Sequence, residues 1–335
     1  MEVAKLPAEY VLPLRWTSAA DGTDEAGLSS LTTYLAVLGE WIDVTVVDGS
    51  PAVAFERHAG AWDALVRHVA PEPRAGVNGK VRGVMTGVGI ARHDRVILAD
   101  DDVRYDYDAL ARVVGALDSA ELVRPQNYFG LLPWHARWDT ARTLVNRAFG
   151  SDYPGTLGVR RNFLLAAGGY DGDVLFENLE LIRTVRAAGG REVRADDLFV
   201  ERLPPDVGHF MRQRVRQAYD GFAQPGRLAV ELALLPLSVW ASRRPGRAAV
   251  AVMIVIAVAE YGRRRAGGAA VFRAGSALWA PLWVIERAGC AWLAVWARLR
   301  GGVRYQGARL YRAATPARVL SARATIRRQG GKERT

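Results

Sequence analysis

The segment RVILADDDVRY, residues 95–105, decides the fold assignment of this chain. Its first half, Arg95–Ala99, is an apolar run typical of a buried strand, and the aspartates Asp100, Asp101 and Asp102 follow directly. Carboxylates two residues apart beyond a strand can point the same way, and their oxygens suit Mg²⁺ or Mn²⁺. An acidic turn, or the N-cap of a following helix, would have the same sequence pattern. The position at the end of a buried strand favours the metal site.

Strands and helices alternate on both sides of this segment. The expected strands are Tyr10–Trp16, Asp43–Val47, Arg95–Ala99 and Glu121–Pro125. The expected helices are Gly27–Leu38, Phe55–Val69, Lys80–Ala91 and Tyr107–Leu117. This alternation predicts an α/β fold with a mostly parallel central sheet, in which ligands bind beyond the carboxyl ends of the strands.

The charge of the chain is unevenly distributed. Its 335 residues suggest about two domains. The net charge of +10 divides into −6 for residues 1–225 (25 Lys and Arg, 31 Asp and Glu) and +16 for residues 226–335 (20 Lys and Arg, 4 Glu). We therefore expect a catalytic domain over 1–225, an apolar helical region over 226–300 and a basic, partly loose tail over 301–335.

The region after residue 225 has a composition typical of a membrane-associated segment. Its apolar stretches are Leu228–Ala241, Ala248–Tyr261 and Ala274–Ala297. Arginine clusters flank the middle stretch, and tryptophans, which suit a membrane interface, are frequent in the last one. Because glutamates interrupt the stretches, we expect one to three short membrane-embedded helices. A nucleic-acid surface rarely needs such apolar runs, so no nucleic-acid partner is expected.

Several classes of protein are excluded or disfavoured. A single cysteine, Cys290, excludes a disulfide framework and a cysteine-rich zinc site. The first ten residues contain no apolar core of a signal peptide, so the catalytic part is expected at the cytoplasmic face of a bacterial-type membrane. The chain contains no P-loop, no GxGxxG after a strand, no HExxH and no GxSxG. The sequence gives no indication of the oligomeric state.

Two further positions near predicted strand ends or helix starts can bind a ligand. Asp48 ends the strand DVTVV and can accept hydrogen bonds from a nucleotide, or it can form an Asx-turn with the following Gly-Ser-Pro. Lys80, one of three lysines beside 42 arginines, opens a helix and can offset diphosphate charge, or it can be an ordinary solvated lysine.

The second half of the predicted catalytic domain adds two candidate segments. Glu177 precedes Asn178 at the start of a helical stretch, where a carboxylate can act as a general base or interact with the helix dipole. Gln213–Gln217 (QRVRQ) can bind phosphates or form an exposed helix face.

Taken together and in this order, five segments resemble glycosyltransferase family 2, whose members have the GT-A fold. The segments are VVDGSP (46–51), NGKVRGVMTGVGIA (78–91), VILADDDVRY (96–105), GGYDGDVLFENLELIRTVRAAGG (168–190) and QRVRQ (213–217). They cover roughly residues 8–220. The apolar region that follows is similar to the membrane-associated part of ceramide-glucosyltransferase-like members.

The resemblance implies an inverting transfer of sugar from a nucleotide-sugar donor to a lipid or cell-envelope glycan. It assigns Asp48, Lys80, Asp100 and Asp101 to the donor. Asp100 and Asp102 would match the DxD motif and hold Mg²⁺ or Mn²⁺, with Asp102 favoured as the direct ligand, and the metal would stabilise the leaving diphosphate.

The chain departs from the family pattern at two positions. The usual Glu-Asp pair, whose Asp is the base, is Glu177-Asn178, and an amide cannot take the proton. Glu177 is then the candidate base, with Asp171 or Asp173 as alternatives. Otherwise the enzyme handles its acceptor differently, or the chain is a catalytically impaired relative that binds sugar nucleotides.

The second departure concerns the acceptor and diphosphate side of the site. Gln213 and Arg216 match the QxxRW-like segment, but Gln217 stands where Trp is expected. This difference favours a single transfer over a processive polymerase.

Overall fold

The computed structural model describes residues 4–16, 25–150, 152–305 and 308–332. Its large sheet contains β1 (Glu9–Leu14), β2 (Asp43–Asp48), β3 (Arg67–Val69), β4 (Arg95–Ala99), β5 (Val103–Arg104), β6 (Leu122–Phe129), β7 (Thr156–Arg160) and β8 (Glu192–Arg202). The helices that pack around it are α1 (Glu25–Trp41), α2 (Ala52–Trp62), α3 (Gly79–Ile90), α4 (Tyr107–Ala116), α5 (Trp134–Phe149), α6 (Arg161–Ala166), α7 (Glu177–Ala187) and α8 (Val207–Tyr219). The C-terminal elements are η2 (Asp220–Ala223), α9 (Pro225–Ser242), α10 (Pro245–Arg264), η3 (Arg265–Ala270), η4 (Ala274–Trp279), α11 (Ala280–Leu299), β9 (Val303–Tyr305), β10 (Ala308–Leu310) and α12 (Ala317–Lys332).

The eight-stranded sheet has the order β3-β2-β1-β4-β7-β6-β8-β5. Strands β3, β2, β1 and β4 are parallel to one another, and β6 is parallel to β8. Strand β7 runs antiparallel to both its neighbours, and the short β5 runs antiparallel to β8. The predicted α/β class with a mostly parallel central sheet and an apolar helical C-terminal region is confirmed.

Strand β4 is buried on both faces of the sheet, as its unbroken apolar sequence predicts. Ile97 and Ala99 pack with α1, α2 and α4, whereas Val96 and Leu98 pack with α3, α6 and α7. This division follows from the two-residue period of a strand. Each large apolar side chain buried in this way contributes about 1.5–3 kcal/mol, so the strand end that carries Asp100 is firmly held.

Helix α3 lies very close to the sheet because it contains a glycine at the crossing point. A Cβ added at Gly87 would lie 2.3 Å from Cγ1 of Val11 in β1. This close approach sets the position of the N-terminus of α3, where Lys80 is the second residue of the helix.

The prediction of one helix over Phe55–Val69 is wrong in its second part. Helix α2 ends at Trp62, and residues 67–69 form the edge strand β3, which pairs with β2 in the register Thr45↔Arg67. The hydrogen bonds of the sheet edge override the helical spacing of the sequence, as tertiary contacts commonly do for short segments.

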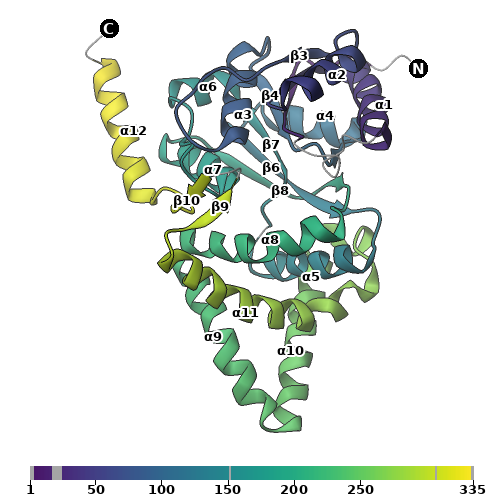
Figure 1. Cartoon of the computed structure of the whole chain (residues 1–335), viewed down its shortest axis with the longest axis vertical. Coiled ribbons are helices and arrows are strands. Elements are labelled where there is room, and N and C mark those ends of the chain that lie inside the picture. Colours follow the sequence, from purple (N-terminus) through teal and green to yellow (C-terminus); the bar gives the residue numbers. More distant parts are fainter. Residues whose placement is uncertain (1–3, 17–24, 151, 306–307, 333–335) are drawn as a thin grey trace.

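The C-terminal region forms a helical layer below the sheet with a projecting hairpin (Figure 1). Helices α9 and α10 project from this layer and converge in a V whose tip lies away from the sheet, and α11 returns across α8 and α5. Within the described residues, one helix, Pro245–Ala270, is long and apolar enough to cross a membrane, and only 11% of its apolar window is buried.

The predicted basic tail is more ordered than expected. Strands β9 and β10 form an antiparallel pair, and α12 follows them along the edge of the molecule, beside α7 (Figure 1). Residues 306–307 and 333–335 of this predicted segment lie outside the described part of the chain.

Candidate functional site

A cleft of about 1360 Å³ lies between the sheet and the helical layer. The segments after β1, β2 and β4 and the start of α7 line its sheet side, and α8, η2, α11 and β9 line the opposite side. The cleft brings together most of the residues predicted for the site: Lys80, Asp100, Asp101, Asp102, Glu177, Gln213 and Arg216. Residues from all three predicted regions meet here, because Arg287 and Tyr305 also line the cleft.

Lys80 is held between two carboxylates. Its Nζ lies 2.5 Å from Oδ1 of Asp100 and 2.7 Å from Oε1 of Glu177. Burial alone lowers the pKa of Lys80, but Asp100 and Glu177 raise it well above its usual value. The ammonium group is therefore charged at all physiological pH values and fixes both carboxylates in the cleft.

The local sequence explains how Lys80 reaches this place. The side chain of Asn78 caps α3 by accepting hydrogen bonds from the backbone nitrogens of Lys80 and Val81. The amide nitrogen of Asn78 also donates to the carbonyl of Val174, at 3.0 Å. One side chain thus ties the start of α3 to the segment that leads into α7 and Glu177.

Asp102 has a buried carboxylate oxygen with no hydrogen-bond partner. Arg202 Nε donates to Oδ2 at 2.7 Å, whereas Oδ1 is unpaired. Burial, with the neighbouring charges of Asp100 and Asp101, raises the pKa of Asp102 to about 6, against the opposing effect of Arg202. An unpaired buried oxygen beside a second carboxylate is the environment that a cation would stabilise.

The donor set fits Mg²⁺ or Mn²⁺. Such ions are commonly held by one or two carboxylates, with phosphate oxygens of the substrate and water completing the shell. Asp102 and Asp100 supply carboxylates of this kind. Among the described residues, no group of three or more His, Cys, Asp or Glu side chains is arranged to hold a metal ion, so the remaining ligands would have to come from the substrate and from water.

Asp101 points to a different partner from its two neighbours. Its Oδ2 accepts a hydrogen bond from the indole nitrogen of Trp16 at 2.7 Å, and the backbone nitrogen of Trp16 donates to Ser50 Oγ at 2.9 Å. Asp101 therefore links the ends of β1, β2 and β4, all at the rim of the cleft.

Asp48 lies at the carboxyl end of β2, as predicted, but its side chain is buried. His58 Nδ1 lies 2.6 Å and His68 Nε2 lies 3.2 Å from Oδ2, while the backbone nitrogen of Ser50 donates to Oδ1 at 2.8 Å. Burial opposes ionisation, but these hydrogen bonds lower the pKa of Asp48 to about 2. Its side chain does not line the cleft, and a nucleotide contact there stays a prediction.

The two residues at the start of α7 differ in their contacts. Glu177 reaches Lys80, whereas Asn178 Nδ2 donates to the carbonyl oxygen of Pro154 at 2.9 Å. The side chain of Asn178 thus has a positioning contact, and Glu177 is the carboxylate that this segment presents to the cleft.

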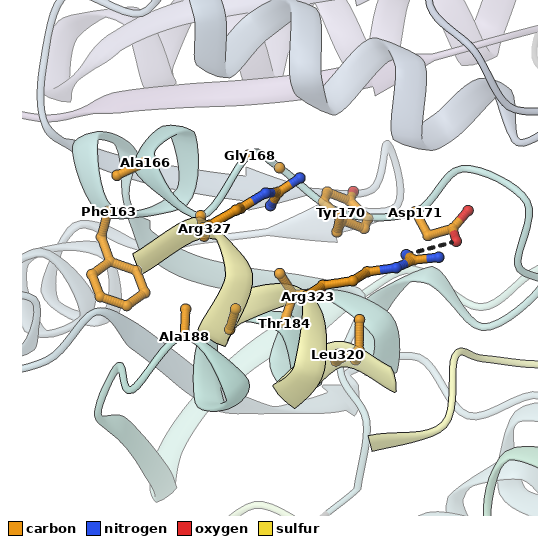
Figure 2. A pocket seen from close by; sticks show the side chains of 13 residues that line it. Phe163, Ala166, Gly168, Tyr170, Asp171, Thr184, Ala188, Leu320, Arg323 and Arg327 are labelled. Atoms are coloured by element: carbon orange, nitrogen blue, oxygen red, sulfur yellow. Dashed lines mark hydrogen bonds and ion pairs between the residues drawn. The ribbon is translucent and has the colours of Figure 1, made fainter. Parts of the chain in front are cut away.

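Asp171 lies outside the cleft, in a separate pocket of about 390 Å³ beside α12. Its Oδ2 lies 3.1 Å from Arg312 and 3.4 Å from Arg323 (Figure 2 shows the second contact). Its Oδ1 accepts from the backbone nitrogen of Asp173, whose own carboxylate accepts from the nitrogen of Val77. The structure therefore brings neither alternative base into the cleft with Glu177.

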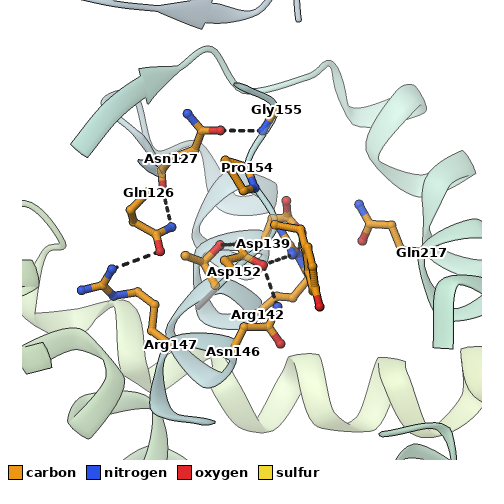
Figure 3. Close-up of polar contacts among 12 residues, drawn as sticks. Gln126, Asn127, Asp139, Arg142, Asn146, Arg147, Asp152, Pro154, Gly155 and Gln217 are labelled. Carbon is orange, nitrogen blue, oxygen red and sulfur yellow. Dashed lines mark hydrogen bonds and ion pairs between the residues drawn. The ribbon is translucent and has the colours of Figure 1, made fainter. Parts of the chain in front are cut away.

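A polar network below the cleft supports its acidic end (Figure 3). Asp152 accepts hydrogen bonds from Arg142 at 2.8 Å and from Asn146 at 2.7 Å, both on α5. Asn127 Oδ1 accepts from the nitrogen of Gly155 at 2.7 Å, and the carbonyl of Gly155 accepts from the nitrogen of Asp100 at 2.9 Å. Helix α5 and strand β6 thereby fix the loop that holds Asp100.

Helix α8 supplies the opposite wall of the cleft. Asp206 caps the helix through the nitrogen of His209, and Gln213, Arg216 and Gln217 line the cleft. The guanidinium of Arg216 lies over the ring of Tyr305, 5.2 Å from its centroid. The predicted phosphate-binding segment is therefore a helix face, and that face is turned into the cleft.

Sequence reasoning missed many of the charged residues of the cleft. Among them are Arg202, Asp220, Arg227 and Arg287. Burial, reinforced by Glu177 and opposed by Arg216, raises the pKa of Asp220 to about 7. The spacing of Arg216 and Asp220, four residues apart at the end of a helix, was a signal for a shared face, but their orientation toward Glu177 depends on the tertiary fold.

Comparison with known proteins found no matching family model and no matching curated protein. Similar solved structures include a mannosyltransferase from Pyrobaculum calidifontis in complex with GDP-Man and Mn²⁺, with 15% identity, 98% of this chain and 87% of that chain covered, and a TM-score of 0.47.

Two further structures are similar over about three-fifths of this chain. A glucosyl-3-phosphoglycerate synthase from Mycobacterium tuberculosis, in complex with Mn²⁺, UDP and glucosyl-3-phosphoglycerate, is 18% identical, with a TM-score of 0.39. The match covers 62% of this chain and 77% of that chain. GalNAc-T7 with UDP, GalNAc and Mn²⁺ is 15% identical, with a TM-score of 0.38, and the match covers 61% of this chain and 44% of that chain. These similarities concern the general course of the chain, so a functional assignment depends on the site itself.

Proposed function

We propose that the protein is a metal-dependent, inverting glycosyltransferase that moves a sugar from a nucleotide-sugar donor to an acceptor at a membrane. The observation that carries the proposal is the cleft in which Asp100 and Asp102, beyond the end of β4, face Lys80 and the arginines of the helical wall. Carboxylates for a cation and cations for a diphosphate meet there, which is the combination that a nucleotide-sugar donor requires.

Each side chain has a definable task in this reaction. Asp102 and Asp100 would hold the divalent ion, which when bound stabilises the negative charge of the leaving diphosphate. Lys80 adds positive charge at the same end and keeps Asp100 oriented. Gln213 and Arg216 line the cleft from the helical wall and would act on its acceptor and diphosphate side.

Two carboxylates of the cleft can take the proton of a hydroxyl acceptor. Glu177 is positioned by its ion pair with Lys80, at 2.7 Å. Asp220 has an unpaired buried oxygen, Oδ1, and an elevated pKa near 7, which is closer to the value that general base catalysis favours. We propose Glu177 as the base predicted from sequence and Asp220 as its competitor.

The membrane location is supported by the α9–α10 hairpin. Its outward side chains include Leu237, Trp240, Val250, Met253 and Ile254, each at least half exposed. Exposed apolar surface of this extent is typical of a membrane or protein contact, and arginines at the hairpin tip suit anionic headgroups. We propose that the hairpin enters the cytoplasmic leaflet of a bacterial-type membrane and that the acceptor is a lipid or an envelope glycan.

A screen of nucleotide sugars, read out as release of nucleoside diphosphate, tests the proposal. We expect turnover of at least one donor with Mn²⁺ or Mg²⁺. Asp102→Ala should lower the affinity for the metal-bound donor at least 100-fold, or about 2.7 kcal/mol, whereas Asp108→Ala, on the exposed side of α4, should leave it unchanged. Absence of donor binding in the unmodified chain would refute the assignment.

A second candidate is a catalytically impaired relative that binds sugar nucleotides. Asn178 favours it, because its amide is bound to Pro154 at the position where the family has its base. This candidate predicts donor binding with no transfer or hydrolysis. Any turnover that Glu177→Gln or Asp220→Asn abolishes would exclude it.

A further inference from the structure

The segment Tyr311–Thr315, which we call the C-terminal strap, contacts both elements that carry the candidate bases of the cleft. It follows β10 and leads into α12, in the region that the sequence predicts as a partly loose tail. Ala313, Ala314 and Thr315 are buried. Among the described residues that line the cleft, none belongs to the strap. The strap can therefore act on the reaction only through other residues.

The strap holds the backbone directly before Glu177. The carbonyl oxygen of Arg312 accepts a hydrogen bond from the backbone nitrogen of Leu175 at 3.0 Å. The carbonyl oxygen of Ala313 accepts one from the backbone nitrogen of Phe176 at 2.8 Å. Phe176 is the N-cap residue of α7, and its side chain cannot accept the hydrogen bond of a helix cap. The strap therefore fixes where α7 begins, a task that a capping side chain performs in α3 and α8.

A buried glutamate in the first turn of α7 fastens the far end of the strap. Glu180 is fully buried, and its Oε2 accepts a hydrogen bond from the backbone nitrogen of Thr315 at 2.6 Å. Burying a carboxyl group costs free energy unless the group is hydrogen-bonded, so this contact favours one fixed placement of the strap on α7. Glu180 and Glu177 belong to the same helical turn, and a shift of one therefore moves the other.

The strap also holds η2, the short helix that begins with the second candidate base. The carbonyl oxygen of Tyr311 accepts a hydrogen bond at 2.6 Å from the hydroxyl of Tyr219, the residue directly before η2. Arg183 on α7 donates to the carbonyl oxygen of Thr315 at 3.3 Å and to that of Ala223, the last residue of η2, at 2.6 Å. Both ends of η2 are thus tied to the strap, one directly and one through Arg183.

A shared apolar cluster fills the space between the strap, α7 and η2. Its buried members from these elements and their neighbours are Leu175, Leu179, Ala218, Tyr219, Ala223, Leu310, Ala313 and Ala314. Because protein interiors are closely packed, a displacement of the strap moves the walls on both sides of it.

We propose that the C-terminal strap sets the distance between Glu177 and Asp220 and so positions the carboxylates that act on the acceptor. The inference rests on the proposed glycosyltransferase function. It makes Glu180 and Arg183, the two side chains that anchor the strap to α7, positioning residues of that reaction. Neither of them lines the cleft, so they act through the backbone that carries the two carboxylates.

The placement of the carboxylates matters because the transfer has to move a proton. The acceptor oxygen forms a bond to the anomeric carbon, and its proton goes to the carboxylate of Glu177 or Asp220. The bond from that carbon to the donor diphosphate breaks, and its electron pair leaves on the nucleoside diphosphate. A misplacement of about 1 Å can lower the rate of such a step about 100-fold.

Paired substitutions at Glu180 test the proposal on the full chain in a neutral detergent. Glu180→Gln keeps a carbonyl oxygen that can accept the hydrogen bond of Thr315, whereas Glu180→Leu has a similar volume and no acceptor. Turnover of a donor from the nucleotide-sugar screen is counted per site that binds nucleoside diphosphate with Mn²⁺, so that unfolded chains do not contribute. We expect Glu180→Leu to lower kcat about tenfold with the KM for the donor unchanged, and Glu180→Gln to retain kcat.

A second anchor keeps the test decisive if Glu180→Leu does not fold. Arg183→Met removes the hydrogen bonds to Thr315 and Ala223 and keeps the aliphatic part of the side chain, and it should also lower kcat per site. Arg327→Gln, at an exposed arginine of α12, is the matched control and should leave kcat unchanged. Equal kcat per site in Glu180→Leu and Glu180→Gln, or in Arg183→Met and Arg327→Gln, would overturn the proposal.

A measurement without turnover separates failure of this proposal from failure of the proposed function. The coupling between Lys80→Gln and Glu177→Gln, measured by chemical denaturation, reports the ion pair of these two residues. We expect the coupling to persist in the Glu180→Gln background and to disappear in the Arg183→Met and Glu180→Leu backgrounds. Coupling that persists in all backgrounds would overturn the role of the strap even in an active enzyme. Coupling that disappears as expected, in a chain that turns over no donor, would support the strap and remove the glycosyltransferase assignment.

Discussion

The substitution Asp220→Asn tests the electrostatics of the cleft. Burial raises the pKa of the Asp220 carboxyl from 3.8 to about 7, and Glu177 adds to this rise while Arg216 opposes it. Because folding raises this pKa, the folded state binds the proton more tightly than the unfolded chain does. The contribution of protonated Asp220 to stability is therefore complete below its ordinary pKa and is lost as the pH rises from about 4 to about 7.

The size of the effect follows from these values. Each pH unit between the two pKa values corresponds to about 1.4 kcal/mol, so the full interval corresponds to about 4 kcal/mol. Because Asp220 keeps some contact with solvent, we expect about half of this, or about 2 kcal/mol. Asparagine has the shape of the protonated acid and does not titrate, so Asp220→Asn should match the unmodified chain near pH 4 and exceed its free energy of unfolding by about 2 kcal/mol at pH 8.

Chemical denaturation of both chains at pH 4.5 and pH 8, in the same detergent and without ligand, measures this difference. Asp108→Asn, an exposed aspartate of α4, is the matched control and should show no pH-dependent difference. A stability difference that is the same at both pH values, or a less stable Asp220→Asn at pH 8, would refute the proposed environment of Asp220.

Three further substitutions test the donor end and the membrane surface. Lys80→Gln leaves two carboxylates without their cation, so we expect chemical denaturation to show a free energy of unfolding lower by about 1–3 kcal/mol. Calorimetry should show weaker diphosphate binding. Unchanged stability and unchanged binding would contradict the role of Lys80. Gly155→Ala puts a Cβ 2.8 Å from Oδ2 of Asp100, so the affinity for donor with Mn²⁺ should fall, whereas Gly115→Ala, whose Cβ meets nothing within 4 Å, should retain it. Ile254→Glu on the exposed face of α10 should weaken vesicle flotation at least tenfold, and undiminished flotation would exclude the hairpin as the membrane contact.

The sequence pattern was sufficient to predict the elements closest to the site. The run Arg95–Ala99 predicts β4 because a strand buried on both faces must be apolar throughout, and the three aspartates after it had to lie at the sheet edge. The start of α3 was also predictable, since Asn78, two positions before Lys80, is a strong capping residue.

Other elements could not be predicted from local pattern. Strand β3 has only three residues and is stabilised by its pairing with β2. Strand β7 enters the sheet antiparallel between β4 and β6, and no local signal specifies the direction of a strand. The burial of Asp48 depends on His58 and His68, which only the pairing of β3 and the position of α2 bring to it.

The sequence by itself determined the α/β class, the carboxylates after β4 and the division into an acidic N-terminal part and a basic, apolar C-terminal part, because these follow from hydrophobic period and composition. The tertiary structure decided which charges meet. Lys80 reaches Glu177 from 97 residues away, and Arg287, in the part assigned to the membrane, lines the same cleft as Asp102. Electrostatic interactions act through space and depend on burial, so their strength appears only when the chain is folded.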